Sequence, residues 1–159
     1  MALGYDLFND KDKLTTKFVA ANVFDNDSPL KELYGQMSIV YTGSFFHLFD
    51  RSEQLDVAKR VVQLLKPEAG STIIGRQMGN LTSGSYEAGG YVGEKARFRH
   101  NPKSWEDLWD EIGEATGTKW KTDASLDGPG VGFGDMEKKL TERRKEAGAR
   151  RMQFIVRRQ

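Results

Sequence analysis

Residues Met37 to Gly79 read MSIVYTGSFFHLFDRSEQLDVAKRVVQLLKPEAGSTIIGRQMG, and this stretch predicts the fold of the chain. It begins with a short apolar run, Met37–Tyr41, and approaches its end with a second one, Ser71–Arg76; both are typical of buried strands. Between the two runs, apolar side chains recur at helical spacing: Leu55, Ala58, Val61, Val62 and Leu65. A strand, a helix and a strand in this order predict a βαβ unit with a right-handed crossover.

The limits of the predicted helix are marked in the sequence. Asp50 and Glu53 have the spacing of a capping box, in which each side chain accepts a hydrogen bond from the backbone of the other residue. The helix is expected to stop at Lys66-Pro67, and Gly70 to turn the chain into the second strand.

The two predicted strands also indicate where a ligand binds. In an open α/β sheet, ligands bind beyond the carboxyl ends of the strands. The residues at these two ends are Thr42, Gly43 and Ser44, and then Arg76, Gln77 and Met78.

Length and composition predict one domain with a sizeable core. The chain has 159 residues, of which 38% are hydrophobic. Its 24 Lys and Arg residues are balanced by 23 Asp and Glu residues, and no aromatic platform accompanies the basic tail, so we expect no nucleic-acid partner. The absence of cysteine excludes disulfides, thiolate metal sites and a cysteine nucleophile.

Two further features bear on metals and on location. The two histidines, His47 and His100, cannot form a zinc site by themselves, and no metal is predicted. No apolar run approaches the ~20 residues that span a bilayer, and the start of the chain lacks the pattern of a signal peptide. We therefore expect a cytoplasmic protein without a membrane partner.

The flanking segments predict further elements of an α/β sheet. Phe18–Phe24 has the pattern of a strand, and Ser28 followed by Pro29 marks the start of a short helix. Thr118–Ala124 alternates like an edge strand, and the apolar run at 152–156 is a final strand.

A second clear helix is expected to begin at Ser104, as its cap, and to end at Gly117. Its apolar stripe consists of Trp105, Leu108, Trp109 and Ile112. Two tryptophans on such a stripe are more typical of a core than of a ligand site.

Two glycine-rich spans are open to more than one interpretation. Residues 79–93 form either a mobile lid over a substrate or a long surface connection. Residues 127–134 contain a G-x-G-x-G pattern, but a charged strand precedes it and a segment poor in apolar residues follows. This context favours a connection between antiparallel strands over a nucleotide-binding loop.

Four short motifs in this order resemble one known family. They are AANVFD at 20–25, SFFHLF at 44–49, LLKPEAGS at 64–71 and the Arg-rich strand at 151–158. Together they resemble class I S-adenosylmethionine-dependent methyltransferases. The greatest similarity is to the fungal group from secondary metabolism, including the meroterpenoid pathways.

The resemblance implies a Rossmann-like α/β sheet with strand order 3-2-1-4-5-7-6 and an antiparallel last strand. By this resemblance, strand 3 would be Phe18–Phe24, strand 4 Met37–Tyr41 and strand 5 Ser71–Arg76. Strand 6 would be Thr118–Ala124 and strand 7 Met152–Arg157. The family's strand 1, glycine loop and strand 2 would precede Leu3, so residues 1–159 are expected to form a single, N-terminally truncated domain.

A domain of this kind would leave strand edges open, which is an association hazard. We consider three outcomes: strand 3 pairs directly with strand 4, two chains form a homodimer through their edges, or the chain folds poorly by itself.

The resemblance also implies roles for individual residues around S-adenosyl-L-methionine. The adenine would be contacted by Asn22, Val23 and Phe24, and the methionine part by Thr42, Gly43 and Ser44. His47 would be the catalytic base, or else a structural turn residue. The substrate would be faced by Arg76, Gln77 and Met78, unless these residues only end a strand.

The expected activity is methyl transfer to an oxygen of a small secondary metabolite, either a carboxylate or a phenol. The alternative is a catalytically inactive relic that acts as an interaction partner or has no activity.

Overall fold

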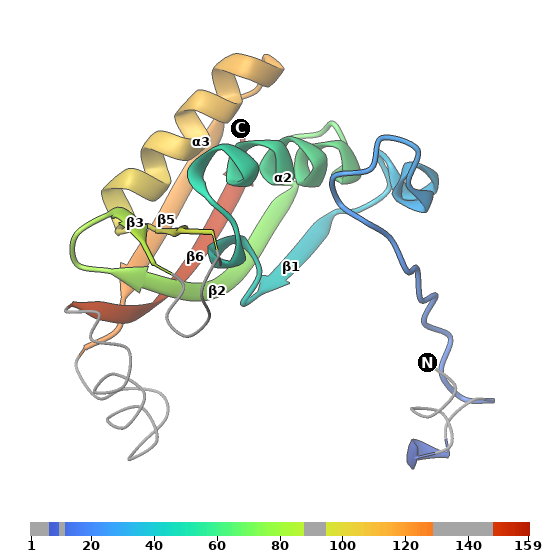
Figure 1. The fold of residues 1–159 in the computed structure, drawn as a ribbon. Helices are drawn as coiled ribbons and strands as arrows, with labels where there is room; N and C mark the ends of the chain where they lie inside the picture. Colours follow the sequence, from blue (N-terminus) through green and yellow to red (C-terminus); the bar gives the residue numbers. More distant parts are fainter. Residues whose placement is uncertain (1–6, 10–11, 88–94, 129–147) are drawn as a thin grey trace.

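A computed structural model describes residues 7–9, 12–87, 95–128 and 148–159 (Figure 1). Its elements in chain order are η1 (Pro29–Leu33), β1 (Ile39–Gly43), η2 (Phe46–Leu48), α2 (Arg51–Leu64), β2 (Thr72–Asn80), β3 (Gly84–Tyr86), β4 (Arg97–Arg99), α3 (Pro102–Thr116), β5 (Trp120–Leu126) and β6 (Ala149–Arg158).

The main sheet has four strands in the order β1-β2-β6-β5. β1 and β2 run parallel, with Ile39 opposite Thr72 and Gly43 opposite Arg76. β6 is antiparallel to both of its neighbours, β2 and β5. This order confirms the 4-5-7-6 half of the predicted sheet and its antiparallel last strand.

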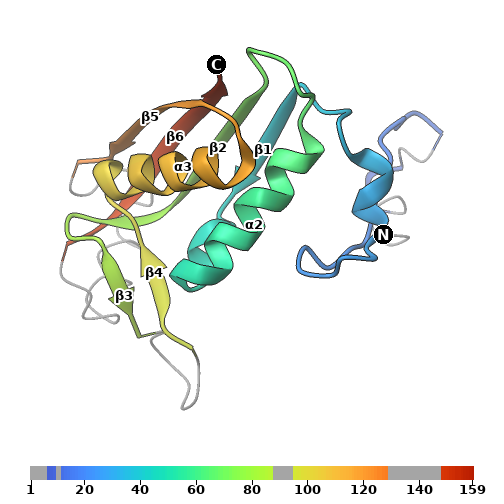
Figure 2. The same cartoon turned by 90° about the horizontal axis from the view of Figure 1, so that it is seen from above.

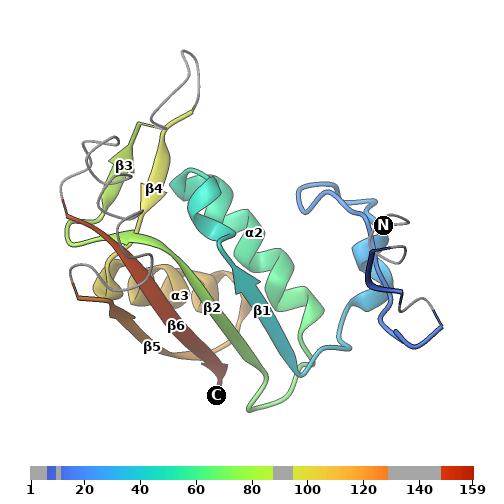
Figure 3. The same cartoon turned by 90° about the horizontal axis from the view of Figure 1, so that it is seen from below.

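Both long helices pack on one face of this sheet (Figure 2). The tryptophan stripe of α3 is buried, as predicted: Trp105, Leu108, Trp109 and Ile112 are all 0% exposed. The opposite sheet face, seen in Figure 3, has no helix over it among the described residues, and Ile39 and Tyr41 are 62% and 63% exposed there.

The predicted capping box of α2 is present. The Asp50 carboxylate accepts from the Glu53 backbone N–H at 2.9 Å, and the Glu53 carboxylate accepts from the Asp50 N–H at 3.2 Å. Ser28 caps η1 with Pro29 at its first position, also as predicted.

The predicted start of α3 was wrong. Asn101 is the cap, Pro102 is in the first turn, and Ser104 is the third helical residue, whose hydroxyl accepts from the Asn101 N–H at 3.1 Å. Asn is a strong cap and Pro suits the first helical position, so the helix begins before Ser104. It ends at Gly117, which has a left-handed φ of 64°.

The predicted strand Phe18–Phe24 does not form. Residues 18–24 have no strand pairing, and the Asn22 carbonyl oxygens instead accept from Phe24 N–H at 3.0 Å and Asp25 N–H at 3.2 Å, which turns the chain. A strand needs a neighbour for its backbone groups, and within the described residues β1 pairs with β2 alone. Direct pairing of predicted strands 3 and 4 is thus also wrong.

The glycine-rich span 79–93 is partly structured. β3 pairs with β4 as a separate two-stranded sheet, with Gly84 opposite Arg99. Residues 88–94 of this span, and 129–134 of the other glycine pattern, lie outside the described residues. No helix of the described chain is both long and apolar enough to cross a membrane.

Candidate functional site

A sharp turn follows β1 at the edge where the sequence predicts a ligand. Ser44 has a left-handed φ of 56°, and its N–H donates to the Arg76 carbonyl oxygen at 2.7 Å. Such a conformation is costly for a residue with a side chain and persists where its surroundings hold it. Here Phe46 is 0% exposed and packs edge-on against Trp105, with ring centroids 5.2 Å apart.

This turn brings several predicted site residues together. A small pocket of about 130 Å³ is lined by Ser44, His47, Arg76, Gln77, Met78 and Arg151. Ser44 directly follows β1, His47 lies in η2, and the next three come from β2. The predicted cofactor residue Ser44, the predicted base and the three predicted substrate residues thus share one pocket.

Two details of β2 differ from the prediction. The strand continues to Asn80, so residues 76–78 lie within it and not beyond its end. Arg151 was missed, because it reaches the pocket through the register of β6, which places it opposite Met78. The sequence carried a signal in its Arg-rich final strand, but no local pattern sets that register.

The two arginines of the pocket differ in their charge balance. Arg151 Nε lies 2.6 Å from Asp127 Oδ2, so a carboxylate offsets its charge. Arg76 is exposed and has no ion pair with any described carboxylate. Arg76 is therefore the cation that can attract an anionic ligand to this edge.

Gln77 adds a buried polar group to the pocket. Gln77 is 3% exposed, and its Oε1 has no hydrogen-bond partner among the described residues. Buried polar atoms are almost always paired. An amide in this position can bind a polar group that enters the pocket, in either orientation of the amide.

His47 lines the same pocket from η2. Its backbone carbonyl accepts from Arg99 Nη1 at 2.7 Å, and Arg99 is 4% exposed. The residue is therefore anchored through its main chain and also lines the pocket, which is compatible with both of the predicted roles.

Of the three residues predicted to contact the methionine part of the cofactor, only Ser44 lines the pocket among the described side chains. Gly43 is the last residue of β1. Thr42 is 6% exposed, and its Oγ1 lies 2.6 Å from where a Cβ on Gly75 would stand, so its side chain packs within the sheet.

The predicted adenine residues lie at a different groove. Val23 and Phe24 line a space of about 430 Å³ beside α2, together with Asn26, Asp56, Lys59, Arg60 and Gln63. The two sites are linked by aromatic rings, since Phe24 packs edge-on with Phe49 at 5.2 Å and Phe49 with Phe45 at 5.3 Å.

The volume of the pocket at Ser44 limits how much of S-adenosylmethionine the described residues can enclose. Pockets for ligands of such size usually enclose about 300–1,000 Å³, and the pocket at Ser44 encloses about 130 Å³. Asn22 is exposed, and its side-chain oxygen already accepts from Phe24 N–H. The pocket fits the reacting end of a cofactor or an acceptor group, whereas the described residues do not enclose the whole cofactor.

Among the residues that the structure describes, the remaining polar groups do not form a metal centre. Within the described ranges, no three His, Cys, Asp or Glu side chains are grouped closely enough to hold a metal ion.

No protein-family model matches the chain, but individual relatives do. It is 44% identical over 120 residues to the O-methyltransferase phiE of Fungal sp. (strain ATCC 74256), which covers 75% of this chain and 39% of that protein. It is 38% identical over 161 residues to the O-methyltransferase atr3 of Stereocaulon alpinum, covering 98% of this chain and 43% of that protein. The chain thus spans about two fifths of the length of these relatives.

Solved structures show the same fold at low sequence identity. A SAM-dependent methyltransferase from Archaeoglobus fulgidus aligns with a TM-score of 0.51 at 12% identity, over 97% of this chain and 72% of that one. The cyclase SpnF aligns with a TM-score of 0.56 at 11% identity, over 98% and 62%. Since one of these proteins is named a cyclase, the fold alone does not fix the reaction.

The sequence relatives and the strand order agree. The chain therefore belongs to the family of fungal secondary-metabolite O-methyltransferases and has the Rossmann-like fold of class I methyltransferases.

Proposed function

We propose that this chain takes part in S-adenosylmethionine-dependent methylation of an oxygen atom on a small secondary metabolite. The observation that carries the proposal is the pocket at the carboxyl end of β1, where Ser44, His47 and Arg76 meet. Ligands bind at this edge in open α/β sheets, and the relatives named above are O-methyltransferases.

A carboxylate is the acceptor that the pocket favours. Arg76 offers a guanidinium with no ion-pair partner among the described carboxylates, and a guanidinium matches the geometry of a carboxylate in a bidentate pair. Gln77 also lines this pocket and has a buried Oε1 without a hydrogen-bond partner among the described residues, so we assign it as a second polar contact for the acceptor.

The chemistry places modest demands on these residues. When bound, S-adenosylmethionine supplies an electrophilic methyl group. Holding the carboxylate oxygen in line with that group supplies most of the rate enhancement, and Arg76 and Gln77 are the residues that would hold it. A carboxylate is already deprotonated, so His47 would act as a base only for a phenol.

The cofactor would contact the chain at two places. Ser44 and Gly43 would face its reacting end, with Thr42 contributing main-chain atoms, because the Thr42 side chain packs within the sheet. Val23 and Phe24 would face the adenine, with Asn22 at the turn that precedes them.

We also propose that two copies of the chain pair through β1. This strand has one neighbour in the described sheet, and Ile39 and Tyr41 are more than half exposed along it. An open edge of this kind is a template for a further strand. The cytoplasmic location stays a prediction from the sequence.

A second candidate function is an interaction partner without catalysis. The observation in its favour is that the described adenine residues and the Ser44 pocket do not form one enclosed site. A folded chain that binds neither cofactor nor acceptor would support this second candidate.

The test is methyl transfer from labelled S-adenosylmethionine by the full chain to matched aromatic carboxylic acids and phenols. We expect methyl esters as the main products. Arg76→Met should lower kcat/KM for the acids by about ten- to a hundredfold, the value of a charged hydrogen bond.

The matched control is Arg157→Met, an exposed arginine of β6 that does not line the pocket. It should leave transfer unchanged. His47→Asn should spare the acids and slow any phenol. A folded wild-type chain that transfers no methyl group, or an Arg76→Met variant as active as wild type, would overturn the proposal.

A further inference from the structure

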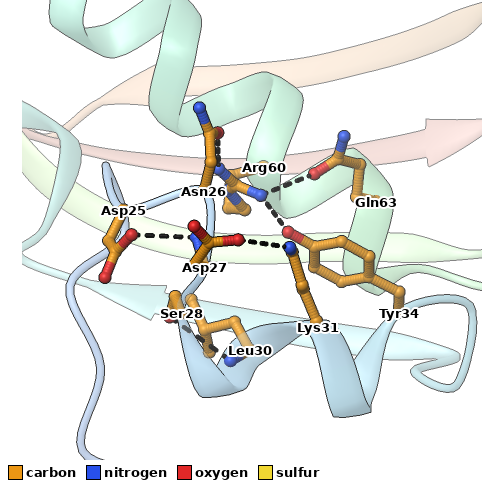
Figure 4. Close-up of polar contacts among 9 residues, drawn as sticks. All are labelled: Asp25, Asn26, Asp27, Ser28, Leu30, Lys31, Tyr34, Arg60 and Gln63. Carbon is orange, nitrogen blue, oxygen red and sulfur yellow. Dashed lines mark hydrogen bonds and ion pairs between the residues drawn. The ribbon is translucent and has the colours of Figure 1, made fainter.

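Arg60 joins α2 to the segment that precedes β1 (Figure 4). Its Nε donates to the Val23 carbonyl oxygen at 3.3 Å, and its Nη2 donates to Asn26 Oδ1 at 2.7 Å. Its Nη1 donates to the Tyr34 hydroxyl and, at 3.1 Å, to Gln63 Oε1. One guanidinium therefore donates hydrogen bonds to the segment before η1, to Tyr34 just after η1, and to Gln63 of its own helix.

The ring of Tyr34 adds a second contact to the same group. The guanidinium carbon lies 5.7 Å from the centre of that ring, within the range of a cation–π interaction. Figure 4 shows Arg60 pointing from the helix between Asn26 and Tyr34.

The segment depends on this side chain because other contacts near it are few or weak. Residues 18–24 pair with no strand. The ion pair between Lys17 and Glu32 is exposed on both sides, 65% and 67%, and such pairs contribute little. Beyond η1 the main chain is fixed to α2, since Gly35 N–H donates to the Gln63 carbonyl oxygen at 2.9 Å.

The near end of the segment therefore has three described tethers to the body of the domain. Phe24 packs on Phe49, Val23 packs against the hydrophobic core, and Arg60 donates hydrogen bonds to Val23 and Asn26. The tethered residues Val23 and Phe24 are also the ones that line the groove beside α2.

We propose that Arg60 is a positioning residue that fixes residues 22–26 against α2 and thereby sets the affinity of the chain for the adenine end of its cofactor. This inference rests on the proposed function. Arg60 need not touch the cofactor; it acts by keeping Val23 and Phe24 in the binding-competent place. If a variant holds the segment correctly in a tenth of its molecules, the apparent affinity falls about tenfold.

Arginine is required for this role by its shape. The planar fork presents several donors in fixed directions, so it can serve a carbonyl, an amide and a hydroxyl together. Lysine keeps the charge but has a single ammonium, which cannot reach Val23, Asn26 and Tyr34 at once.

Two measurements on the full chain test the inference with the variants Arg60→Met, Arg60→Lys and Arg157→Met. Arg157→Met is the matched control, because Arg157 is an exposed arginine of β6 that does not line the groove. The first measurement is amide hydrogen exchange without ligand. The second is isothermal titration with S-adenosylhomocysteine.

In Arg60→Met we expect faster exchange at the amides of Phe24, Asp25 and Ser28, with α2 protected as in wild type. We expect affinity for S-adenosylhomocysteine to fall about tenfold. Arg60→Lys should fall between Arg60→Met and wild type, and Arg157→Met should match wild type in both measurements.

The inference is overturned by unchanged exchange in Arg60→Met, or by faster exchange with unchanged affinity. An equal loss of affinity in Arg157→Met would also overturn it, because the loss of one positive charge elsewhere on the surface would then account for the effect. A wild-type chain that binds no ligand counts against the proposed function, and the exchange arm then decides by itself whether Arg60 fixes the segment.

Discussion

At the scale of single residues, His100 shows how the domain holds a buried titratable group. It is 0% exposed, with Nε2 3.1 Å from Gln54 Oε1 and Nδ1 2.9 Å from the Ser104 hydroxyl. Gln54 also donates to the carbonyl oxygens of Phe49 and Phe98 at 3.1 and 3.0 Å. The network joins α2, α3 and β4 behind the turn that carries His47.

This burial makes stability depend on pH. Burial, and secondly the charge of Arg51, lower the pKa of His100 to about 3 from its usual 6.5. Between these two values the unfolded chain binds the extra proton, so stability falls as the pH falls below about 6.5. We expect a loss of about 2 kcal/mol in the free energy of unfolding between about pH 7.5 and about pH 5 from this group.

Denaturant unfolding at several pH values checks this expectation. In His100→Gln the pH-dependent loss should shrink by that amount, whatever the variant's absolute stability. If the free energy of unfolding of His100→Gln depended on pH as it does in wild type, His100 would not be the group responsible for the loss of stability.

At the scale of elements, the start of α2 rests on one carboxylate. Asp50 accepts from Glu53 N–H at 2.9 Å and from the Ser52 hydroxyl at 2.7 Å. The hydrogen bond from Glu53 N–H, followed by that from Ser52, lowers the pKa of Asp50. This cap also fixes the direction in which the chain enters the helix from η2 and the pocket.

We expect Asp50→Ala to destabilise the domain by about 1 kcal/mol, as typical of a lost N-cap. Asp56→Ala removes the same charge from the exposed middle of the helix and should change stability by less than about 0.5 kcal/mol. Paired chemical unfolding of the two variants measures the difference. Equal effects would mean that charge, and not the cap, accounts for the loss.

The elements also show what the sequence could and could not predict. The cap of α2 was predictable because its partners are three residues apart. The strand at 18–24 was wrong because a strand depends on a distant neighbour, which no local pattern reports. Arg151 was missed for the same reason, since the register of β6 against β2 places it beside Met78.

In the candidate site, too, local patterns predicted some features, whereas others depend on contacts between distant parts of the chain. The grouping of Ser44 and His47 with residues 76–78 was predictable, because the end of a parallel strand, here β1, is a known place for ligands, and Arg76 lies opposite that end. The separation between the Ser44 pocket and the groove at Val23 was not, because it follows from the path of an unpaired segment held by side chains such as Arg60.

At the scale of the whole molecule, the open edge of β1 is the feature that bears on assembly. Ser38 and Ser44 use their main chain toward β2, since Thr72 N–H donates to Ser38 O and Ser44 N–H donates to Arg76 O. Residues alternate along a strand, so the backbone groups of Ile39 and Tyr41 face outward from the sheet. Both side chains are also exposed.

If two copies pair here, Tyr41→Lys should shift the chain from dimer to monomer, because a charge at an edge blocks strand pairing. Ser125→Lys, on the exposed side of β5, is the control and should leave the dimer intact. Sedimentation velocity over a range of concentrations measures both. A wild-type chain that is monomeric throughout would contradict the pairing.

The central claim is that the edge formed by β1 and β2 belongs to a methyl-transfer site. The most direct test is isothermal titration of S-adenosylhomocysteine into residues 1–159, with adenosine triphosphate as the control ligand and circular dichroism to verify folding. We predict saturable binding of S-adenosylhomocysteine, in the micromolar range, and none of the control. A folded sample that releases no heat with S-adenosylhomocysteine would contradict the claim.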